Sequence, residues 1–219
     1  MVVLGDRNGV PKRTKGFNQV GPCQCNSEDH RIRRQRQLLA MDGLTPSERD
    51  KRFGLLVPGR NAKPIEAVRS AADARKGLIT LSGAPGTGKT TLLICAVNDA
   101  RERGIPAVYT TVTDLLDYLR KAYDPKQTSL SFDARWELLS GAEVLALDEM
   151  DEFNTTDWAI ERFLRLMDER WRAMDRCLTL CATNSGLVNL PDKVGSRLGD
   201  GRAEVLEMAG TDMRKHLGW

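Results

Sequence analysis

From residue 77 onward, short apolar runs alternate with longer stretches in which apolar residues recur at helical spacing. The runs have the length of buried strands, and the longer stretches have the length of helices. The predicted strands are 78–81, 107–112, 144–147, 178–182 and 203–206, and the predicted helices are 90–103, 114–121 and 156–174. Because strands that alternate with helices form right-handed βαβ units, the pattern predicts an α/β fold with a parallel five-stranded sheet flanked by helices.

The first 76 residues lack this alternation. Residues 1–22 carry scattered Gly, Lys, Pro and Asn without a period, which predicts a mobile segment. Thr45, Pro46 and Glu48 have the spacing of a capped helix start. Residues 65–75 have apolar positions at helical spacing and predict a further helix.

The composition, with 41% apolar and 29% charged residues in 219, is that of an ordinary globular protein with enough chain for a full core. No run reaches the roughly 18 apolar residues of a membrane span. Residues 1–10 lack the apolar stretch of a secretory signal, and the 5 cysteines are an odd number that does not favour a disulfide scaffold. We therefore expect a cytoplasmic protein with no membrane partner.

The charge is unevenly distributed along the chain, although the net charge is only +3. Residues 1–76 hold 16 Lys and Arg against 8 Asp and Glu, whereas the remainder holds 17 against 22. A basic front ahead of an acidic body indicates either a polyanionic or acidic partner for the front, or a solvated basic tail. The sequence leaves both interpretations open.

The loop after the first predicted strand matches the phosphate-binding pattern G-x-x-x-x-G-K-[ST] in full. It reads Gly83-Ala84-Pro85-Gly86-Thr87-Gly88-Lys89-Thr90, and Thr91 follows it in a predicted helix. The glycines let backbone N–H groups turn toward phosphate oxygens, and the helix N-terminus adds partial positive charge. Lys89 would supply a full charge to the β- and γ-phosphates, and Thr90 would supply a hydroxyl to Mg²⁺.

Two acidic residues, Asp148 and Glu149, follow directly after the predicted strand 144–147. The first carboxylate would lie beside the phosphate loop, within reach of the Mg²⁺ shell. The second can orient and deprotonate a water for attack on the γ-phosphate, which favours hydrolysis over transfer to a small molecule. Asp151 and Glu152 are interpreted as the solvated start of the next helix.

With these motifs together, the sequence resembles the DnaC/IstB-like branch of the AAA+ ATPases over roughly residues 40–217. Beside the phosphate loop, the segments that carry the likeness are Leu147-Asp148-Glu149, Cys181-Ala182-Thr183-Asn184, 194–201 and Gly210-Thr211-Asp212-Met213-Arg214. The resemblance implies ATP and Mg²⁺ as cofactors and an AAA+ P-loop NTPase domain at 77–219. A basic, partly disordered extension at 1–40 and a helical linker at 41–76 would precede it. Because the chain ends at Trp219, we expect no C-terminal helical lid domain.

The resemblance also implies roles for three further residues. Asn184 corresponds to the sensor that holds the γ-phosphate or the attacking water, and a turn or cap is the alternative. Arg197, in the loop before the last predicted strand, corresponds to the arginine that reaches the nucleotide of a neighbouring subunit in a ring or spiral. Its alternative is a surface arginine paired with Asp200, and Arg202 competes for the role. Arg214 corresponds to a second sensor arginine, without the lid that usually carries it.

The front segment departs further from that family, whose loaders often carry a cysteine-rich or helical region that grips the replicative helicase. Here Cys23 and Cys25 precede an arginine-rich stretch, with His30 as a candidate third ligand. A structural zinc site needs four ligands, so zinc is not expected. The three remaining cysteines are predicted to be small core residues.

In this branch the segment between the second and third strands lines the inner surface of the ring or spiral, and here it spans 113–139. Its aromatic and cationic side chains could stack bases and screen phosphates. The predicted nucleic-acid contacts are Tyr123, Lys121 and Lys126, because Tyr123 sits at a predicted helix end near solvent. The alternative is that the aromatic residues, Tyr118 among them, are helix core.

Two functions share every one of these motifs. The first is an ATP-dependent helicase loader of phage or prophage type, which binds a replicative DnaB-type helicase and places it on single-stranded DNA. The second is an IstB-like transposition helper ATPase that binds duplex DNA and a transposase. The arginine-rich front segment favours the loader. Glu149 argues against a third class, the small-molecule P-loop kinases.

Overall fold

The computed structural model of the chain describes residues 24–57, 59–124, 130–152 and 156–210, with side chains from residue 29 onward. The chain divides into two units, Met1–His30 and Arg31–Trp219. Of the first unit, the structure describes only the beginning of helix α1 (Gln24–Leu39). Cys23, Lys126 and Arg214 lie outside the described residues, as does the side chain of Cys25.

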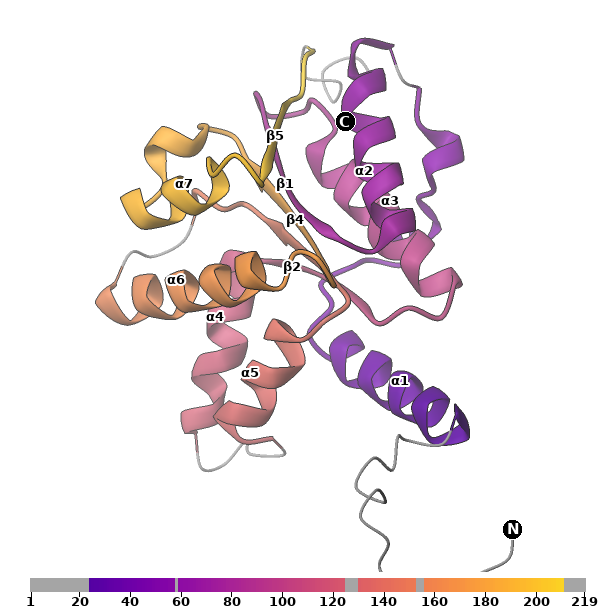
Figure 1. Cartoon of the computed structure of the whole chain (residues 1–219), viewed down its shortest axis with the longest axis vertical. Coiled ribbons are helices and arrows are strands. Elements are labelled where there is room, and N and C mark those ends of the chain that lie inside the picture. Colours follow the sequence, from indigo (N-terminus) through magenta and orange to yellow (C-terminus); the bar gives the residue numbers. More distant parts are fainter. Residues whose placement is uncertain (1–23, 58, 125–129, 153–155, 211–219) are drawn as a thin grey trace, which may run out of the picture. The chain divides into compact units, whose positions relative to one another are not determined.

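The five strands form one parallel sheet in the order β2-β3-β4-β1-β5 (Figure 1). They are β1 (Gly77–Ser82), β2 (Ala107–Thr111), β3 (Val144–Asp148), β4 (Leu178–Thr183) and β5 (Glu204–Glu207). The prediction of a parallel five-stranded sheet is confirmed. β3 and β4 are buried along their whole length, because helices cover both faces of a parallel sheet.

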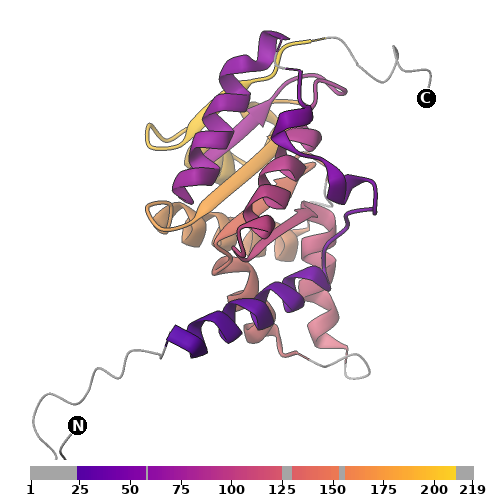
Figure 2. The ribbon, with the colours of Figure 1, turned by 90° about the vertical axis from the view of Figure 1, so that its right-hand side faces the viewer.

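Helices cover both faces of the sheet, and Figure 2 looks onto the face that carries α2 and α3. The second-unit helices are α2 (Ala62–Ala74), α3 (Lys89–Glu102), α4 (Val112–Arg120), α5 (Phe132–Ser140), α6 (Asp157–Arg172) and α7 (Asp192–Leu198). Each face has its own cluster of buried apolar side chains. Leu145 and Leu147 of β3 enter the cluster with α4 to α7, whereas Val144 and Ala146 enter the one with α2 and α3. None of the described helices is long and apolar enough to cross a membrane.

The structure differs from the predicted elements in three places. The second strand ends at Thr111, whose hydroxyl accepts a hydrogen bond from the backbone N–H of Asp114 (3.0 Å) and so caps α4. Glu48 accepts hydrogen bonds from Thr45, but a three-residue 3₁₀ turn follows instead of a helix. The short helices α5 and α7 were not predicted. They have only 9 and 7 residues, and α7 also contains a glycine.

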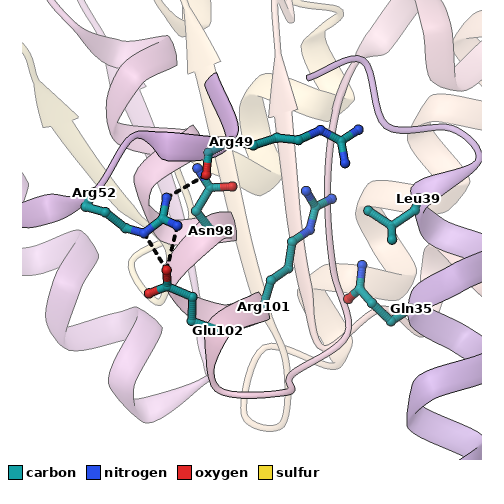
Figure 3. Close-up of a pocket in the computed structure, with 7 residues that line it drawn as sticks. All are labelled: Gln35, Leu39, Arg49, Arg52, Asn98, Arg101 and Glu102. Carbon is teal, nitrogen blue, oxygen red and sulfur yellow. Dashed lines mark hydrogen bonds and ion pairs between the residues drawn. The ribbon is translucent and has the colours of Figure 1, made fainter. Parts of the chain in front are cut away.

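The segment before α2 is fastened to the C-terminal half of α3 by polar side chains (Figure 3). Asn98 donates to two main-chain carbonyl groups of that segment, at 2.8 and 3.0 Å. Arg101 makes two hydrogen bonds to the buried carboxylate of Asp42, and Arg52 pairs with Glu102. These side chains border a cavity of about 330 Å³. Because the charged groups around it are paired with one another, we interpret the cavity as part of a structural tether.

Arg170 is a fully buried arginine on α6, one helical turn after the buried Met167. Its guanidinium group donates to the main-chain carbonyls of Ser140, Ala142 and Leu178 and to the hydroxyl of Thr179. Burial lowers the pKa of Arg170 from its ordinary value, while these four acceptors replace the lost water. Arg170 thereby links α6 to the end of α5 and the start of β4.

Replacing this side chain by one of similar length without donors should destabilise the fold strongly. Arg170→Met leaves several buried carbonyl groups without a partner, and we expect the free energy of unfolding to fall by about 3 kcal/mol or more. Urea unfolding followed by circular dichroism measures the loss. Arg165→Met is the matched control, since Arg165 is an exposed residue of the same helix, and it should cost about 1 kcal/mol or less. Equal stability of the two variants would contradict the structural role of Arg170.

Candidate functional site

The phosphate loop joins β1 to α3 in the predicted strand–loop–helix order. Gly86 and Gly88 adopt positive φ values of 77° and 95°, which favour glycine. Lys89 is the first residue of α3, and its buried ammonium group donates to the carbonyls of Gly83 (2.6 Å) and Ala84 (2.9 Å). Thr90 follows with an exposed side chain in the first helical turn. The loop therefore presents the lysine and the hydroxyl at the helix N-terminus, where phosphate binding is favoured.

The residues that directly follow β5, Met208 and Ala209, pack close to the phosphate loop and to the residue before α2. A β-carbon on Gly83 would collide with the carbonyl oxygen of Met208, so only glycine fits there. Asn61, just before α2, accepts a hydrogen bond from the backbone N–H of Ala209 (2.8 Å) and donates to the carbonyl of Ala209 (3.0 Å) and, more weakly, of Thr87 (3.4 Å). No local pattern marks Asn61 in the sequence, because its partners lie far away in the chain.

Strand register brings the two acidic residues to the edge of the sheet that carries the phosphate loop. Leu147 of β3 lies opposite Cys181 of β4, which lies opposite Thr80 of β1. Asp148 comes one residue after Leu147, and the loop begins three residues after Thr80. Since only β4 separates β1 from β3, the two strand ends are about 10 Å apart. A phosphate group could be held between them.

The carboxylate of Asp148 is buried and held by two hydrogen bonds. One oxygen accepts from the hydroxyl of Tyr109 in β2 (2.9 Å), and the other accepts from the backbone N–H of Glu149 (2.9 Å). Burial, and then the charge of Asp148, raise the pKa of Tyr109 well above its ordinary value, so the phenol remains a donor. The one sequence signal for Tyr109 was an aromatic hydroxyl in the middle of a predicted strand.

Glu149 has an exposed side chain and a left-handed backbone conformation (φ 53°). A positive φ is uncommon for residues other than glycine and is often found at functional sites. The next residue, Met150, is fully buried and donates its backbone N–H to the carbonyl of Ala182 in β4 (3.1 Å). Although the side chain is largely exposed, its partial desolvation raises the pKa of Glu149, and the negative charges of Asp148 and Glu152 add to the effect.

Asn184 directly follows β4, between the ends of β1 and β3. Its side-chain amide donates to Glu152 (3.2 Å), and its backbone N–H donates to Asp151 (3.1 Å). Asp151 also accepts from the backbone N–H (2.9 Å) and the hydroxyl (2.6 Å) of Ser185. Burial alone would raise the pKa of Asp151, but the hydrogen bonds from Ser185 and Asn184 lower it. The interpretation of Asp151 as the solvated start of a helix is therefore wrong, because this carboxylate anchors the end of β4.

Arg197 lies in the last turn of α7 rather than in a loop, and it does not pair with Asp200. Its guanidinium group binds one carboxylate oxygen of Asp168 in α6, with two nitrogens at 3.1 Å. Arg202 is the arginine that pairs with Asp200 (3.3 Å). Both arginines also lie over the ring of Trp171. None of these described partners belongs to the chain's own phosphate loop.

The segment predicted to contact nucleic acid is split between surface and core. Tyr123 ends a 3₁₀ turn (Lys121–Tyr123) with 59% of its side chain exposed, and Lys121 is exposed as well. Tyr118 instead packs against the core, with the buried Arg135 4.5 Å from its ring. The alternative that the segment forms helix core therefore applies to Tyr118, whereas Tyr123 and Lys121 are accessible to a ligand.

The comparison with families of known proteins identifies the fold. Residues 79–208 match the model of the "ATPase family associated with various cellular activities (AAA)", which is more than half of the chain. The chain belongs to the AAA family. The matched region of this AAA protein contains the phosphate loop, Asp148, Glu149, Asn184 and Arg197. Together with the sheet order, the match confirms the predicted AAA+ P-loop NTPase fold. Among the described residues, β5 is the last regular element.

Proteins similar to this AAA protein include a phage-element protein in sequence and replication proteins in fold. The phage-like element PBSX protein XkdC of Bacillus subtilis (strain 168) is 25% identical over 88% of this chain and 76% of that protein. The DnaC helicase loader shares the fold with a TM-score of 0.61 and 17% identity, over 75% of this chain and 100% of that one. Replication initiator DnaA, bound to AMPPCP and single-stranded DNA, has a TM-score of 0.64 and 17% identity over 81% of this chain. The chain spans only 57% of that DnaA.

The residues of the AAA site fit a nucleoside triphosphate and a divalent cation. The loop backbone is shaped by positive-φ glycines. The ammonium group of Lys89 lies within the loop, where it donates to the carbonyl oxygens of Gly83 and Ala84. Thr90 and Asp148 provide a hydroxyl and a carboxylate, the kinds of oxygen ligand that Mg²⁺ prefers. The hydrogen bond from Tyr109 fixes the orientation of the Asp148 carboxylate, as outer-layer partners of metal ligands commonly do.

Proposed function

We propose that this AAA protein is an ATP-dependent, DnaC-like helicase loader. It would bind a replicative DnaB-type helicase and place it on single-stranded DNA, in the cytoplasm of a bacterial host or a phage-infected cell. The observation that carries the ATP-dependent part of the proposal is the convergence of the phosphate loop, Asp148, Glu149 and Asn184 at one edge of the sheet. The shared fold with the DnaC helicase loader and the likeness to a phage-element protein support the choice of this branch.

In the proposed site the loop from Gly83 to Thr91 binds the phosphates of ATP, and Lys89 neutralises the β- and γ-phosphates. Thr90 and Asp148 would hold Mg²⁺, which when bound spreads the negative charge of the phosphates. Glu149 is exposed at the mouth of the site and takes the proton of the attacking water.

Three further groups complete the proposed chemistry. Asn184 lies between the two strand ends, where its amide can orient the attacking water or the γ-phosphate. Arg197 acts in trans, so that hydrolysis occurs at the interfaces of a ring or spiral of subunits. Arg214 would be a second sensor, as the resemblance implies.

The DNA partner distinguishes a loader from a transposition helper. A loader should prefer single strands, and Tyr123→Ala should weaken that binding about tenfold, since one stacked base contributes roughly 1–3 kcal/mol. Affinity should also fall steeply with salt, because Lys121 and Lys126 would displace counterions from phosphates. Fluorescence anisotropy with ATP and labelled single-stranded and duplex oligonucleotides measures both effects.

Basal ATP hydrolysis should be unaffected by Tyr123→Ala, because Tyr123 lies outside the nucleotide motifs. Val188→Ala serves as the control, since Val188 is an apolar residue outside the segment that is even more exposed (90%) than Tyr123, and it should leave DNA affinity unchanged. A duplex preference that Tyr123→Ala does not alter would overturn the loader proposal and favour the IstB-like transposition helper.

A further inference from the structure

Two arginines share the ring of one tryptophan at the interface of α6 and α7, which lie side by side (Figure 1). The guanidinium carbon of Arg197 lies 4.8 Å from the ring centroid of Trp171, and that of Arg202 lies 3.8 Å from it. Both distances are within the range of cation–π interactions. Trp171 is in the last turn of α6, Arg197 in the last turn of α7 and Arg202 in the turn before β5.

The arginines around Trp171 outnumber the carboxylates. Asp168 binds Arg197 and also pairs with Arg172 (2.7 Å), while Asp200 binds Arg202. Three guanidinium groups therefore share two carboxylates. The side chains of Arg197 and Arg202 are 42% and 61% exposed, so both can reach an anion outside their own subunit.

We propose that Trp171 is a positioning residue of the trans-acting site, and that it holds Arg197 and Arg202 together as a pair directed at the nucleotide of the neighbouring subunit. This inference rests on the proposed ATPase function and adds two residues to it. A free arginine side chain has many rotamers, and binding an anion then requires it to be ordered. Contacts with the indole ring and with Asp168 order Arg197 before the subunits meet, so less freedom is lost at the interface.

The position of Trp171 separates this role from simple packing. The ring packs against the edge of a core cluster but is only partly buried, whereas Phe163, Leu166 and Met167 of the same helix are fully buried. The ring of Trp171 instead has both guanidinium groups within cation–π distance. A smaller aromatic ring at this position should therefore preserve most of the function, whereas an aliphatic side chain should not.

The expected kinetic effect falls on turnover rather than on nucleotide binding. Trp171→Ala should lower kcat about 5- to 20-fold, the size expected when two cation–π contacts are lost. Affinity for a fluorescent ATP analogue should stay unchanged, because Trp171 does not contact the phosphate loop of its own subunit. Trp171→Phe should recover at least half of the turnover, and Arg202→Ala should lower kcat by several-fold.

Subunit mixing assigns Trp171 to one side of the interface. Trp171→Ala subunits retain Glu149, so mixing them with Glu149→Gln subunits should restore turnover at interfaces where an intact Glu149 meets an intact Trp171 and Arg197. Mixing Trp171→Ala with Arg197→Ala subunits should restore nothing, since both changes damage the same side. A merely structural role for Trp171 predicts no difference between the two mixtures.

Trp158→Ala is the matched control, since Trp158 lies on the same helix with Arg120 4.9 Å from its ring, and it should leave turnover unchanged. Wild-type turnover of Trp171→Ala alongside an inactive Arg197→Ala would overturn the role of Trp171 and leave the proposed ATPase intact. Wild-type turnover of Arg197→Ala would instead overturn the trans arginine of the proposed function. Equal losses in Trp171→Phe and Trp171→Ala, or a loss of ATP binding in both, would also refute the positioning role.

Discussion

Glu149→Gln is expected to keep ATP binding and to lose about 10²- to 10⁴-fold in kcat, the usual contribution of a general base. The amide preserves the size and hydrogen bonding of the side chain but cannot accept a proton from water. Binding of a fluorescent ATP analogue and steady-state phosphate release measure the two properties separately. Lys89→Ala is the contrasting variant, because it removes the charge that faces the phosphates and should lose binding itself.

The pH dependence of hydrolysis offers a second test of Glu149. Burial and the neighbouring carboxylates raise its pKa above the ordinary value of a glutamate. Because only the ionised carboxylate can take a proton, kcat should fall as the pH is lowered through this raised pKa. The acidic limb of the pH–rate profile should thus lie at higher pH than for an unperturbed glutamate. The residual activity of Glu149→Gln should lack that limb. Wild-type turnover in Glu149→Gln would show that another group activates the water.

Arg197→Ala is expected to lower kcat by about 10³-fold or more, the effect of removing an arginine that stabilises the transition state in trans. Alone, this variant and Glu149→Gln should each show only their residual turnover. A mixture of the two should recover activity, because some interfaces then join an intact Glu149 to an intact Arg197. Phosphate release across mixing ratios, with assembly followed by sedimentation, measures the recovery.

The same experiment tests whether the protein works as an oligomer. Wild-type turnover per subunit should rise with protein concentration if each site needs a neighbour. An assembled mixture without any recovery would move the trans role away from Arg197, first to Arg202. Trp171→Ala and Arg202→Ala then distinguish a single trans arginine from the proposed pair.

The sequence predicted the parts of the site that are local. The phosphate loop lies between a strand and a helix, and its glycines, Lys89 and Thr90 are neighbours in the chain, so a short pattern identifies them. The pair Asp148–Glu149 follows an apolar run, which marks the end of a buried strand. The alternation of apolar runs with helical stretches likewise determined the fold class, because burial of one face or of a whole strand leaves a period in the sequence.

Only the tertiary structure decided which distant side chains meet. The insertion of β4 between β1 and β3 places Asn184 between the phosphate loop and Asp148, and no local pattern encodes strand order. Tyr109 reaches Asp148, and Asn61 reaches Ala209, across 39 and 148 residues of chain. Arg170 can be buried because carbonyl groups from other elements surround it, and its own segment gives no sign of them. Such contacts depend on register and packing, which are determined by the whole core rather than by any one segment.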